Sequence, residues 1–278
     1  MPEIIPNPSN STCRDAIHRI SDGDAMNRVC TGEKYFAPTD FENGSVFLID
    51  KPLDWTSFDV VNLIRAVIKK YHQIRKLKVG HAGTLDTLAT GLLILCTGRM
   101  TKQIDNFQAQ EKVYTGTMLL GQTTPTYDLE SEPNQFFTTD NISAEALDEA
   151  RKKFIGDIMQ RPPKFSAIKI QGKRAFDYAR SDEELEMKER LVHIDDFQID
   201  TTNFPKVDFM VKCSKGTYIR SLVNDFGQAL GNGACLISLR RTKIGDFDVK
   251  DAWDLMELKQ KIIETATEKP ENINDISK

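Results

Sequence analysis

The segment from Val79 to Leu95 constrains this chain most. It reads V-G-H-A-G-T-L-D-T-L-A-T-G-L-L-I-L, and Asp86 is its one carboxylate. Its glycines permit backbone conformations that other residues avoid, and the apolar run after Asp86 is typical of a buried element. We therefore expect Asp86 at the end of a glycine-shaped loop, against the core and facing a cavity, where a carboxylate must be paired or used. The alternative is an Asp that caps a helix or stabilises a turn.

The composition bounds the class of protein. The 278 residues suffice for one large domain or two small ones, and 40% hydrophobic and 28% charged residues are typical of a soluble globular protein. No apolar run approaches the roughly 20 residues of a membrane span, and the N-terminus lacks the layout of a signal peptide. The five cysteines and four histidines are dispersed, which indicates reduced thiols in a cytoplasmic protein and argues against a zinc site.

Charge is unevenly distributed along the chain. The net charge is −4, yet residues 61–112 hold nine Lys/Arg against three Asp/Glu, and residues 151–180 hold nine against two. Seven acids and no bases lie between residues 128 and 149. A basic face on an acidic protein can still bind phosphates, although solvated helix faces would give the same counts.

The central segment resembles a known catalytic motif. It is similar to G-H-x-G-x-L-D-P-x-A-T-G-x-L of the TruB family of tRNA pseudouridine synthases, with Thr87 where that family usually has proline. The resemblance implies that Asp86 is the essential catalytic carboxylate. It also implies that His81 holds the space that a flipped-out base leaves.

Further segments resemble motifs of the same family. Residues 51–57 resemble K-P-x-G-x-T-S, with Asp54 at the usual glycine, and residues 112–121 resemble K-x-Y-x-G-x-x-x-L-G, where the tyrosine, here Tyr114, packs on the target base. Residues 213–222 resemble C-S-K-G-T-Y-I-R-S-L, whose arginine, here Arg220, pairs with the catalytic Asp. From the residues alone, the favoured alternatives are a Lys-Pro pair that shapes the strand-to-helix turn and a tyrosine that is an ordinary half-buried strand residue.

The expected RNA contacts follow from these motifs and from a basic segment. Residues 160–180 resemble Q-x-P-P-x-x-S-A-x-K-x-x-G-x-R-x-Y-x-x-A-R, with Phe176 for the usual tyrosine, and such interleaved basic and aromatic residues suit phosphate contact and stacking. A basic hairpin followed by a helix is the alternative. Residues 239–241 resemble the closing L-R-R, whose leucine forms an apolar wall. The candidate substrate-binding residues are therefore His81, Tyr218, Leu239, Lys51, Lys164, Lys169 and Arg174.

Local patterns predict the following elements. We expect strands over 46–49, 112–121 and 207–213, and helices over 57–71, 144–155 and 217–230. Thr56 to Asp59 fits a capping box, residues 214–216 a tight turn, and residues 123–143 a long surface loop.

The irregular alternation of strands and helices favours an α+β fold. The resemblance implies the pseudouridine synthase fold, a mixed, largely antiparallel sheet flanked by helices with RNA-binding insertions. The expected organisation is an N-terminal extension over 1–44, a catalytic domain over 45–255, and a short helix with a charged tail over 256–278. Many family members carry a C-terminal PUA domain, for which this tail is too short.

The function implied by the resemblance is isomerisation of uridine 55 in the T-loop of tRNA to pseudouridine. The base would be flipped out, cleaved from the sugar with Asp86 as nucleophile or base, and rejoined through carbon. Arg220 would keep Asp86 ionised, and Tyr114 would stack on the uracil. We expect a monomer acting on the T-arm without a metal or redox cofactor. A tRNA-binding protein without the chemistry and a glycoside hydrolase, which would need a second carboxylate, are the alternatives.

Overall fold

The computed structural model describes residues 29–30, 41–165, 169–170, 173–174 and 187–267, and side chains for 41–165 and 187–267. The chain divides into two compact units. Unit 1 comprises Met1–Gln108 and Lys243–Lys278, and unit 2 comprises Ala109–Thr242. The extension predicted for residues 1–44 lies mostly outside the described residues. The predicted domain boundaries after residues 44 and 255 stay a prediction.

Unit 1 is built on the antiparallel strands β2 (Val46–Lys51) and β4 (Ala89–Thr97). The short strand β3 (Val79–His81) pairs antiparallel with β4, whereas β1 (Val29–Cys30) and β15 (Trp253–Asp254) pair parallel with β2. Strand β14 (Phe247–Asp248) pairs antiparallel with the end of β13 (Ala234–Ile244), at Lys243 and Ile244. The strands of this unit are therefore mixed in direction.

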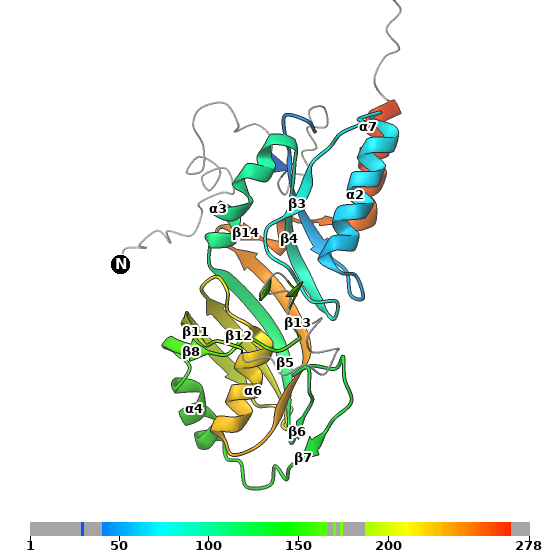
Figure 1. Cartoon of the computed structure of the whole chain (residues 1–278). Coiled ribbons are helices and arrows are strands. Elements are labelled where there is room, and N and C mark those ends of the chain that lie inside the picture. The colour runs from blue at the N-terminus through cyan, green and yellow to red at the C-terminus, as the bar shows by residue number, and fades with distance from the viewer. Residues whose placement is uncertain (1–28, 31–40, 166–168, 171–172, 175–186, 268–278) are drawn as a thin grey trace, which may run out of the picture. The chain divides into compact units, whose positions relative to one another are not determined.

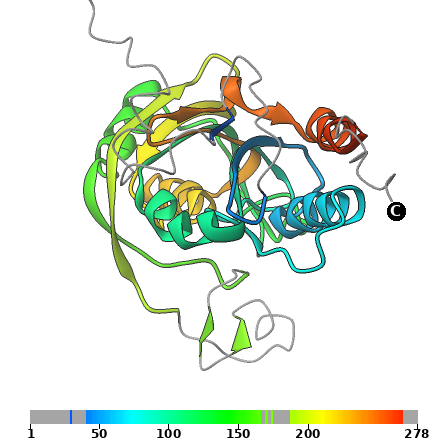
Figure 2. The ribbon, with the colours of Figure 1, turned by 90° about the horizontal axis from the view of Figure 1, so that it is seen from above.

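Both faces of the β2–β4 pair are buried, which explains the continuous apolar runs of these strands. Side chains alternate between two core clusters, so that Phe47 and Ile49 face one and Val46 and Leu48 face the other. The first cluster includes helices α2 (Ser57–Tyr71) and α7 (Leu255–Thr267), which lie side by side in Figures 1 and 2. The second includes Phe107 of α3 (Ile104–Ala109), which follows the 3-10 helix η2 (Gly98–Gln103). A 3-10 turn, η3, spans Val249–Asp251.

Unit 2 contains a sheet with the strand order β13-β5-β12-β11-β8. Its members are β5 (Lys112–Leu120), β8 (Gly156–Gln160), β11 (Arg190–Asp200), β12 (Lys206–Cys213) and β13 (Ala234–Ile244). The β5–β12, β12–β11 and β11–β8 pairs are antiparallel. A Cβ on Gly116 of β5 would lie 2.4 Å from the carbonyl oxygen of Ser238, so this position requires glycine.

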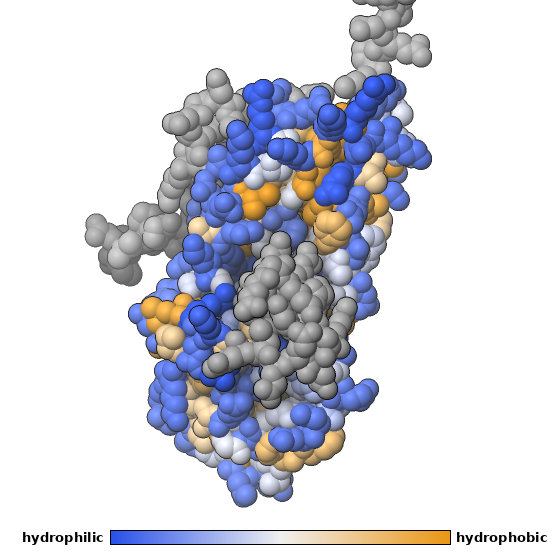
Figure 3. Space-filling view, viewed as in Figure 1, coloured by the Kyte–Doolittle hydropathy of each residue, from blue (hydrophilic) through white to orange (hydrophobic). Residues whose placement is uncertain are grey.

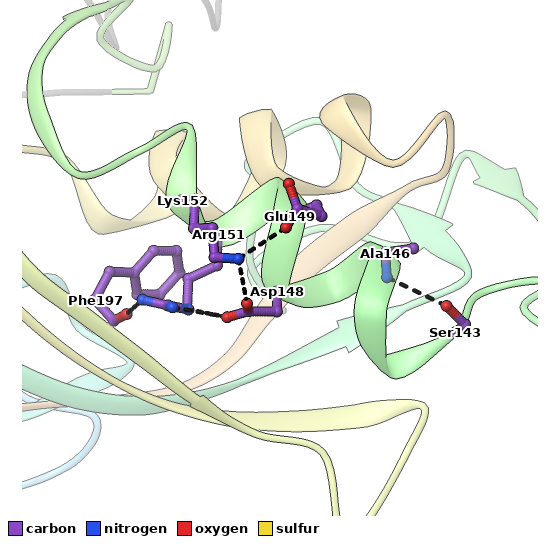
Figure 4. Close-up of polar contacts among 7 residues, drawn as sticks. All are labelled: Ser143, Ala146, Asp148, Glu149, Arg151, Lys152 and Phe197. Carbon is purple, nitrogen blue, oxygen red and sulfur yellow. Dashed lines mark hydrogen bonds and ion pairs between the residues drawn. The ribbon is translucent and has the colours of Figure 1, made fainter.

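Two helices of unit 2 pack near β11. Phe226 of α6 (Ile219–Ala229) meets Phe197 of β11 edge to face, with ring centroids 5.8 Å apart. Helix α4 (Ala144–Lys152) is capped by the Ser143 hydroxyl, and its Arg151 donates to the carbonyl of Phe197 at 2.7 Å, as Figure 4 shows. Two short antiparallel pairs complete the unit: β6 (Gln122–Thr123) with β7 (Gln135–Phe136), and β9 (Lys169–Ile170) with β10 (Lys173–Arg174).

The structure confirms the predicted α+β class and the mixed, largely antiparallel pairing. It also confirms the predicted strands and helices to within a few residues, and the capping box at Thr56 and Asp59 has both hydrogen bonds. Strands β11 and β13 were not predicted. The predicted surface loop over 123–143 is wrong in its first part, because Thr124, Thr126 and Asp128 are buried. Among the described residues, no helix is long and apolar enough to cross a membrane.

Helix α7 belongs to the core of unit 1, so truncating its buried side should destabilise the fold. Leu258 is fully buried, whereas Met256 on the same helix is 48% exposed. We expect Leu258→Ala to lower the free energy of unfolding by about 2–5 kcal/mol. Met256→Ala, the matched control, should change it by less than about 0.5 kcal/mol. Denaturant unfolding measures both; equal, small effects would contradict this role for α7.

Candidate active site

The loop that carries Asp86 is shaped by positive backbone angles and a turn. Gly83 has φ +98° and Gly91 φ +104°, in the region that favours glycine. The amide of Ala89 donates to the carbonyl of Asp86 at 3.1 Å and closes a turn in which Thr87 is the second residue. Proline is favoured at that position of common turns, so the proline that is usual in the family motif would fit the turn that Thr87 occupies here. Asp86 itself is half-buried.

The main chain is anchored on both sides of Asp86 by the turn between β2 and α2. The hydroxyl of Ser57 accepts from the amide of Leu85 at 2.9 Å and donates to the carbonyl of Leu85 at 3.1 Å. The carbonyl of Thr87 accepts from the amide of Asp54 at 3.1 Å. The two motifs that surround residues 51 and 86 are thus one hydrogen-bonded unit.

Lys51 adds a buried charge to this anchor. Its side chain is fully buried, and its ammonium group donates to the carbonyls of Trp55 at 2.6 Å, Pro52 at 2.9 Å and Thr87 at 3.4 Å. A charge removed from water needs such partners. These contacts favour the alternative in which Lys51 shapes the turn, and they do not favour the RNA contact that we expected for it.

The backbone angle of Asp54 explains how an aspartate can replace the glycine that is usual at this position of the family motif. Asp54 has φ +63°, the left-handed region that glycine adopts without strain. Asp is among the residues that enter this region most readily, because its short side chain can bond locally. The turn geometry expected of the family's glycine is therefore retained with an aspartate.

The remaining candidates are His81 in unit 1 and three basic residues in unit 2. His81 ends β3, opposite Leu95 of β4, and is half-buried. Lys164 is exposed in unit 2. Lys169 and Arg174 lie in β9 and β10, where the structure describes the backbone alone, so their side chains are outside the described part.

In unit 2, Arg220 is held in the interior by carbonyl and carboxylate oxygens. It lies in the first turn of α6 and is 4% exposed. Its guanidinium donates to the carbonyls of Phe165 at 2.9 Å and Thr126 at 3.2 Å, and its Nε lies 3.6 Å from a carboxylate oxygen of Asp128. Removing one member of a buried ion pair leaves the other charge uncompensated.

Asp128 is a buried partner of Arg220 that was not predicted from the sequence. It is 5% exposed, and Thr124 donates to its carbonyl at 2.7 Å. The preceding Tyr127 has φ +65°, a strained angle for a bulky residue, and its carbonyl accepts from the amide of Leu236 at 2.9 Å. The alternation of Thr124, Thr126 and Asp128 was the available signal, but the acidic surroundings masked it.

The aromatic and apolar candidates of unit 2 lie on three elements. Tyr114 of β5 is buried and lies opposite Val211 of β12. Tyr218 is the N-cap residue of α6, and Leu239 lies on β13; both are half-buried.

Lys112 lies on β5, two residues before Tyr114. Burial and the positive charge of Arg241 lower the pKa of its ammonium group to about 8. Among the described residues, no group of three or more His, Cys, Asp or Glu could hold a metal ion.

The contacts of Lys51 predict a specific mutant phenotype. Lys51→Met keeps the length of the side chain but removes the donor from three carbonyls, so we expect the free energy of unfolding to fall by about 1–3 kcal/mol. Ser57→Ala, which removes the second anchor, should act in the same direction. Thermal unfolding measures both variants. A Lys51→Met protein as stable as the parent would indicate that the ammonium does not hold the loop.

Comparisons with known proteins agree with the motifs. A model described as "TruB family pseudouridylate synthase (N terminal domain)" matches residues 69–219, and one described as "tRNA pseudouridylate synthase B C-terminal domain" matches residues 220–276. A protein of Flavobacterium johnsoniae named tRNA pseudouridine synthase B is 52% identical over 219 residues, 78% of this chain and 96% of that protein. A protein of the same name from Parabacteroides distasonis is 50% identical over 74% of this chain and 88% of that protein.

A solved structure shows the same fold. A chain in the crystal structure of a Cbf5-Nop10-Gar1 complex matches with a TM-score of 0.57 and 28% identity over 78% of this chain. The present chain spans about half of that chain, 54% of its length. The expected pseudouridine synthase fold is confirmed. From its family models and relatives, the chain belongs to the TruB family of pseudouridylate synthases.

Proposed function

We propose that this chain isomerises uridine 55 in the T-loop of tRNA to pseudouridine. The observation that supports it most is the Asp86 loop, whose neighbouring residues Leu85 and Thr87 are both bonded to the β2–α2 turn. Such anchoring fixes a carboxylate at a reacting centre. The relatives named tRNA pseudouridine synthase B add the substrate and the reaction class.

The proposed reaction breaks the bond between N1 of uracil and C1′ of ribose, and forms one between C5 and C1′. The C5 proton is lost and N1 gains one, so the product is an isomer of the substrate. Asp86 acts at the sugar or removes a proton from it, Tyr114 stacks on the flipped uracil, and Arg220 pairs with Asp86. Tyr218 and Leu239 line the pocket, and His81 occupies the space that the base vacates.

The product distinguishes this function from its alternatives. Purified protein is incubated with unmodified tRNA and, in parallel, with an isolated T-arm stem–loop, and the nucleosides are separated. A carbon-linked uridine isomer at position 55 is the expected result. Free uracil would identify a glycoside hydrolase, and binding without a new nucleoside would identify a binding protein. Turnover of the stem–loop supports recognition through the T-arm.

A cationic surface of unit 1 supports the proposed contact with RNA phosphates. We define the β3–η2 basic cluster as Lys78, Arg99 and Lys102, all exposed. The amide of Gly98 donates to the carbonyl of Lys78 at 2.9 Å, which brings the first two residues together. Arg99 and Lys102 are three residues apart on a 3-10 helix and share one face. None of the three forms an ion pair with another described residue, so their charges are available to an anion.

We also propose that the chain acts as a monomer in the cytoplasm. On the face that Figure 3 shows, hydrophilic residues cover most of the coloured surface, with smaller apolar areas between them. Large apolar patches on a surface are typical of protein interfaces. Sedimentation of the purified chain tests the monomer directly.

Removing the charge of Asp86 should stop the chemistry and leave binding in place. We expect Asp86→Asn to give no detectable product with tRNA affinity within a few fold of the parent, because the amide keeps the shape of the carboxylate but neither attacks the sugar nor accepts its proton. Single-turnover assays with excess enzyme measure it. Near-parental product formation would exclude Asp86 as the catalytic group.

Neutralising the basic cluster should weaken RNA binding and its dependence on salt. Each phosphate contact contributes a log–log slope of about −0.7 to −0.9, so alanine at all three positions should flatten the slope by about 2–3 if all bind phosphate. Lys152→Ala is the matched control, because Lys152 is exposed but paired with Asp148 and Glu149 (Figure 4). An unchanged slope in the triple variant would show that the cluster does not contact RNA.

A further inference from the structure

Gln160 holds the main chain of Tyr218 from both sides. It is the last residue of β8 and is fully buried. Its side-chain amide donates to the carbonyl of Tyr218 at 3.0 Å, and its side-chain oxygen accepts from the amide of Tyr218 at 2.8 Å. A primary amide is a side-chain group that donates and accepts at once without a charge. Gln160 thus satisfies both polar groups of one residue.

The ring of Tyr218 is held by the neighbour of Gln160 in the sheet. Arg190 of β11 lies directly opposite Gln160 in the antiparallel ladder. Its guanidinium carbon lies 4.6 Å from the centre of the Tyr218 ring, and it also donates to the carbonyl of Gly216 in the preceding turn. An arginine over an aromatic face is attracted to the ring. Two paired residues therefore fix the backbone and the ring of one tyrosine.

Fixing Tyr218 also fixes the start of α6. Tyr218 is the N-cap residue, and its carbonyl accepts from the amide of Leu222 at 3.0 Å as well as from Gln160. Next along the chain, the hydroxyl of Ser221 donates to the carbonyl of Arg161 at 2.8 Å. Arg220 lies between these two attachments. The end of β8 therefore sets where the first turn of α6, with Arg220, is placed.

We propose that Gln160 and Arg190 are positioning residues for the reaction: Gln160 fixes the main chain of Tyr218, and with it Arg220, and Arg190 fixes the Tyr218 ring. This inference rests on the proposed function. Neither residue needs to touch the substrate. A small displacement of groups around a reacting centre slows the chemical step strongly, whereas distant phosphate contacts are unaffected. The expected signature is a loss of rate at constant affinity.

The test compares Gln160→Met and Gln160→Glu with the parent protein. Methionine retains the volume but makes neither hydrogen bond; glutamate accepts from the amide of Tyr218 but can donate to its carbonyl only when protonated. We expect both variants to slow the single-turnover rate on tRNA roughly 10–100-fold. Affinity for tRNA should stay within a few fold. Rates close to the parent, or parallel losses of rate, affinity and thermal stability, would overturn the proposal.

A pH series separates the hydrogen bond from a merely structural role. Burial raises the pKa of a carboxyl group, and the cation of Arg190 opposite residue 160 lowers it, whereas the charge of Arg161 is paired with Glu189 at 3.0 Å. The series therefore covers roughly pH 5 to 9. The rate of Gln160→Glu relative to Gln160→Met should rise as the pH falls, because the protonated glutamate regains the donor. Gln198→Glu, on the exposed side of β11, is the matched control and should keep a constant ratio to the parent. A flat ratio for Gln160→Glu would overturn the proposal.

Arg190 is tested by two substitutions in the same assay. Arg190→Lys keeps a cation near the ring and should retain most of the rate, whereas Arg190→Met should lose it at constant affinity. Equal rates for Arg190→Met and the parent would exclude the role. The parent protein separates the two proposals: if it forms no pseudouridine, the proposed function fails, and if it does while the variants match it, only the positioning role fails.

Discussion

The Asp86 loop depends on the hydrogen bonds that the buried ammonium group of Lys51 donates to main-chain carbonyls. A cation removed from water would cost several kcal/mol without partners, and here carbonyls from the β2–α2 turn and from the loop supply them. The charge of Lys51 therefore keeps the β2–α2 turn and the Asp86 loop, which are distant in the sequence, in contact. Ser57 repeats the connection with neutral groups on the other side of Asp86. A site on such an anchor is defined by the scaffold rather than by the loop's own sequence.

Unit 2 uses the same principle with different chemistry. The guanidinium of Arg220 donates hydrogen bonds to two carbonyls and lies beside the carboxylate of Asp128. The main chain of Tyr218 is held by the uncharged side-chain amide of Gln160. In both units the candidate functional residues sit beside buried polar groups whose hydrogen bonds are specific in direction. Buried polar groups whose hydrogen bonds are all made keep the surrounding structure rigid and allow few alternative arrangements.

Much of this fold could be predicted from the sequence where one pattern dominates. The capping box at Thr56 and the alternation over β12 gave their elements directly, because local bonding and period decide them. Strand β11 could not be predicted, since its residues Asp195 and Asp196 interrupt the pattern and its partners β8 and β12 decide it. Lys51 and Asp128 show the same limit within the site: burial of a charge depends on partners far along the chain, as the separation of 36 positions between Lys51 and Thr87 illustrates.

The division of the chain has a consequence for the order in which it is made. Unit 2 is one continuous segment, Ala109–Thr242, set between the two parts of unit 1. Trp253, Leu255, Leu258 and Ile262 belong to the unit 1 core, yet they leave the ribosome only after the whole of unit 2. During synthesis the sheet of unit 2 can form first. Until α7 is synthesised, the side of β2, β4 and α2 that packs against it in the finished fold stays exposed. The nascent unit 1 therefore exposes an apolar surface until its last helix is synthesised.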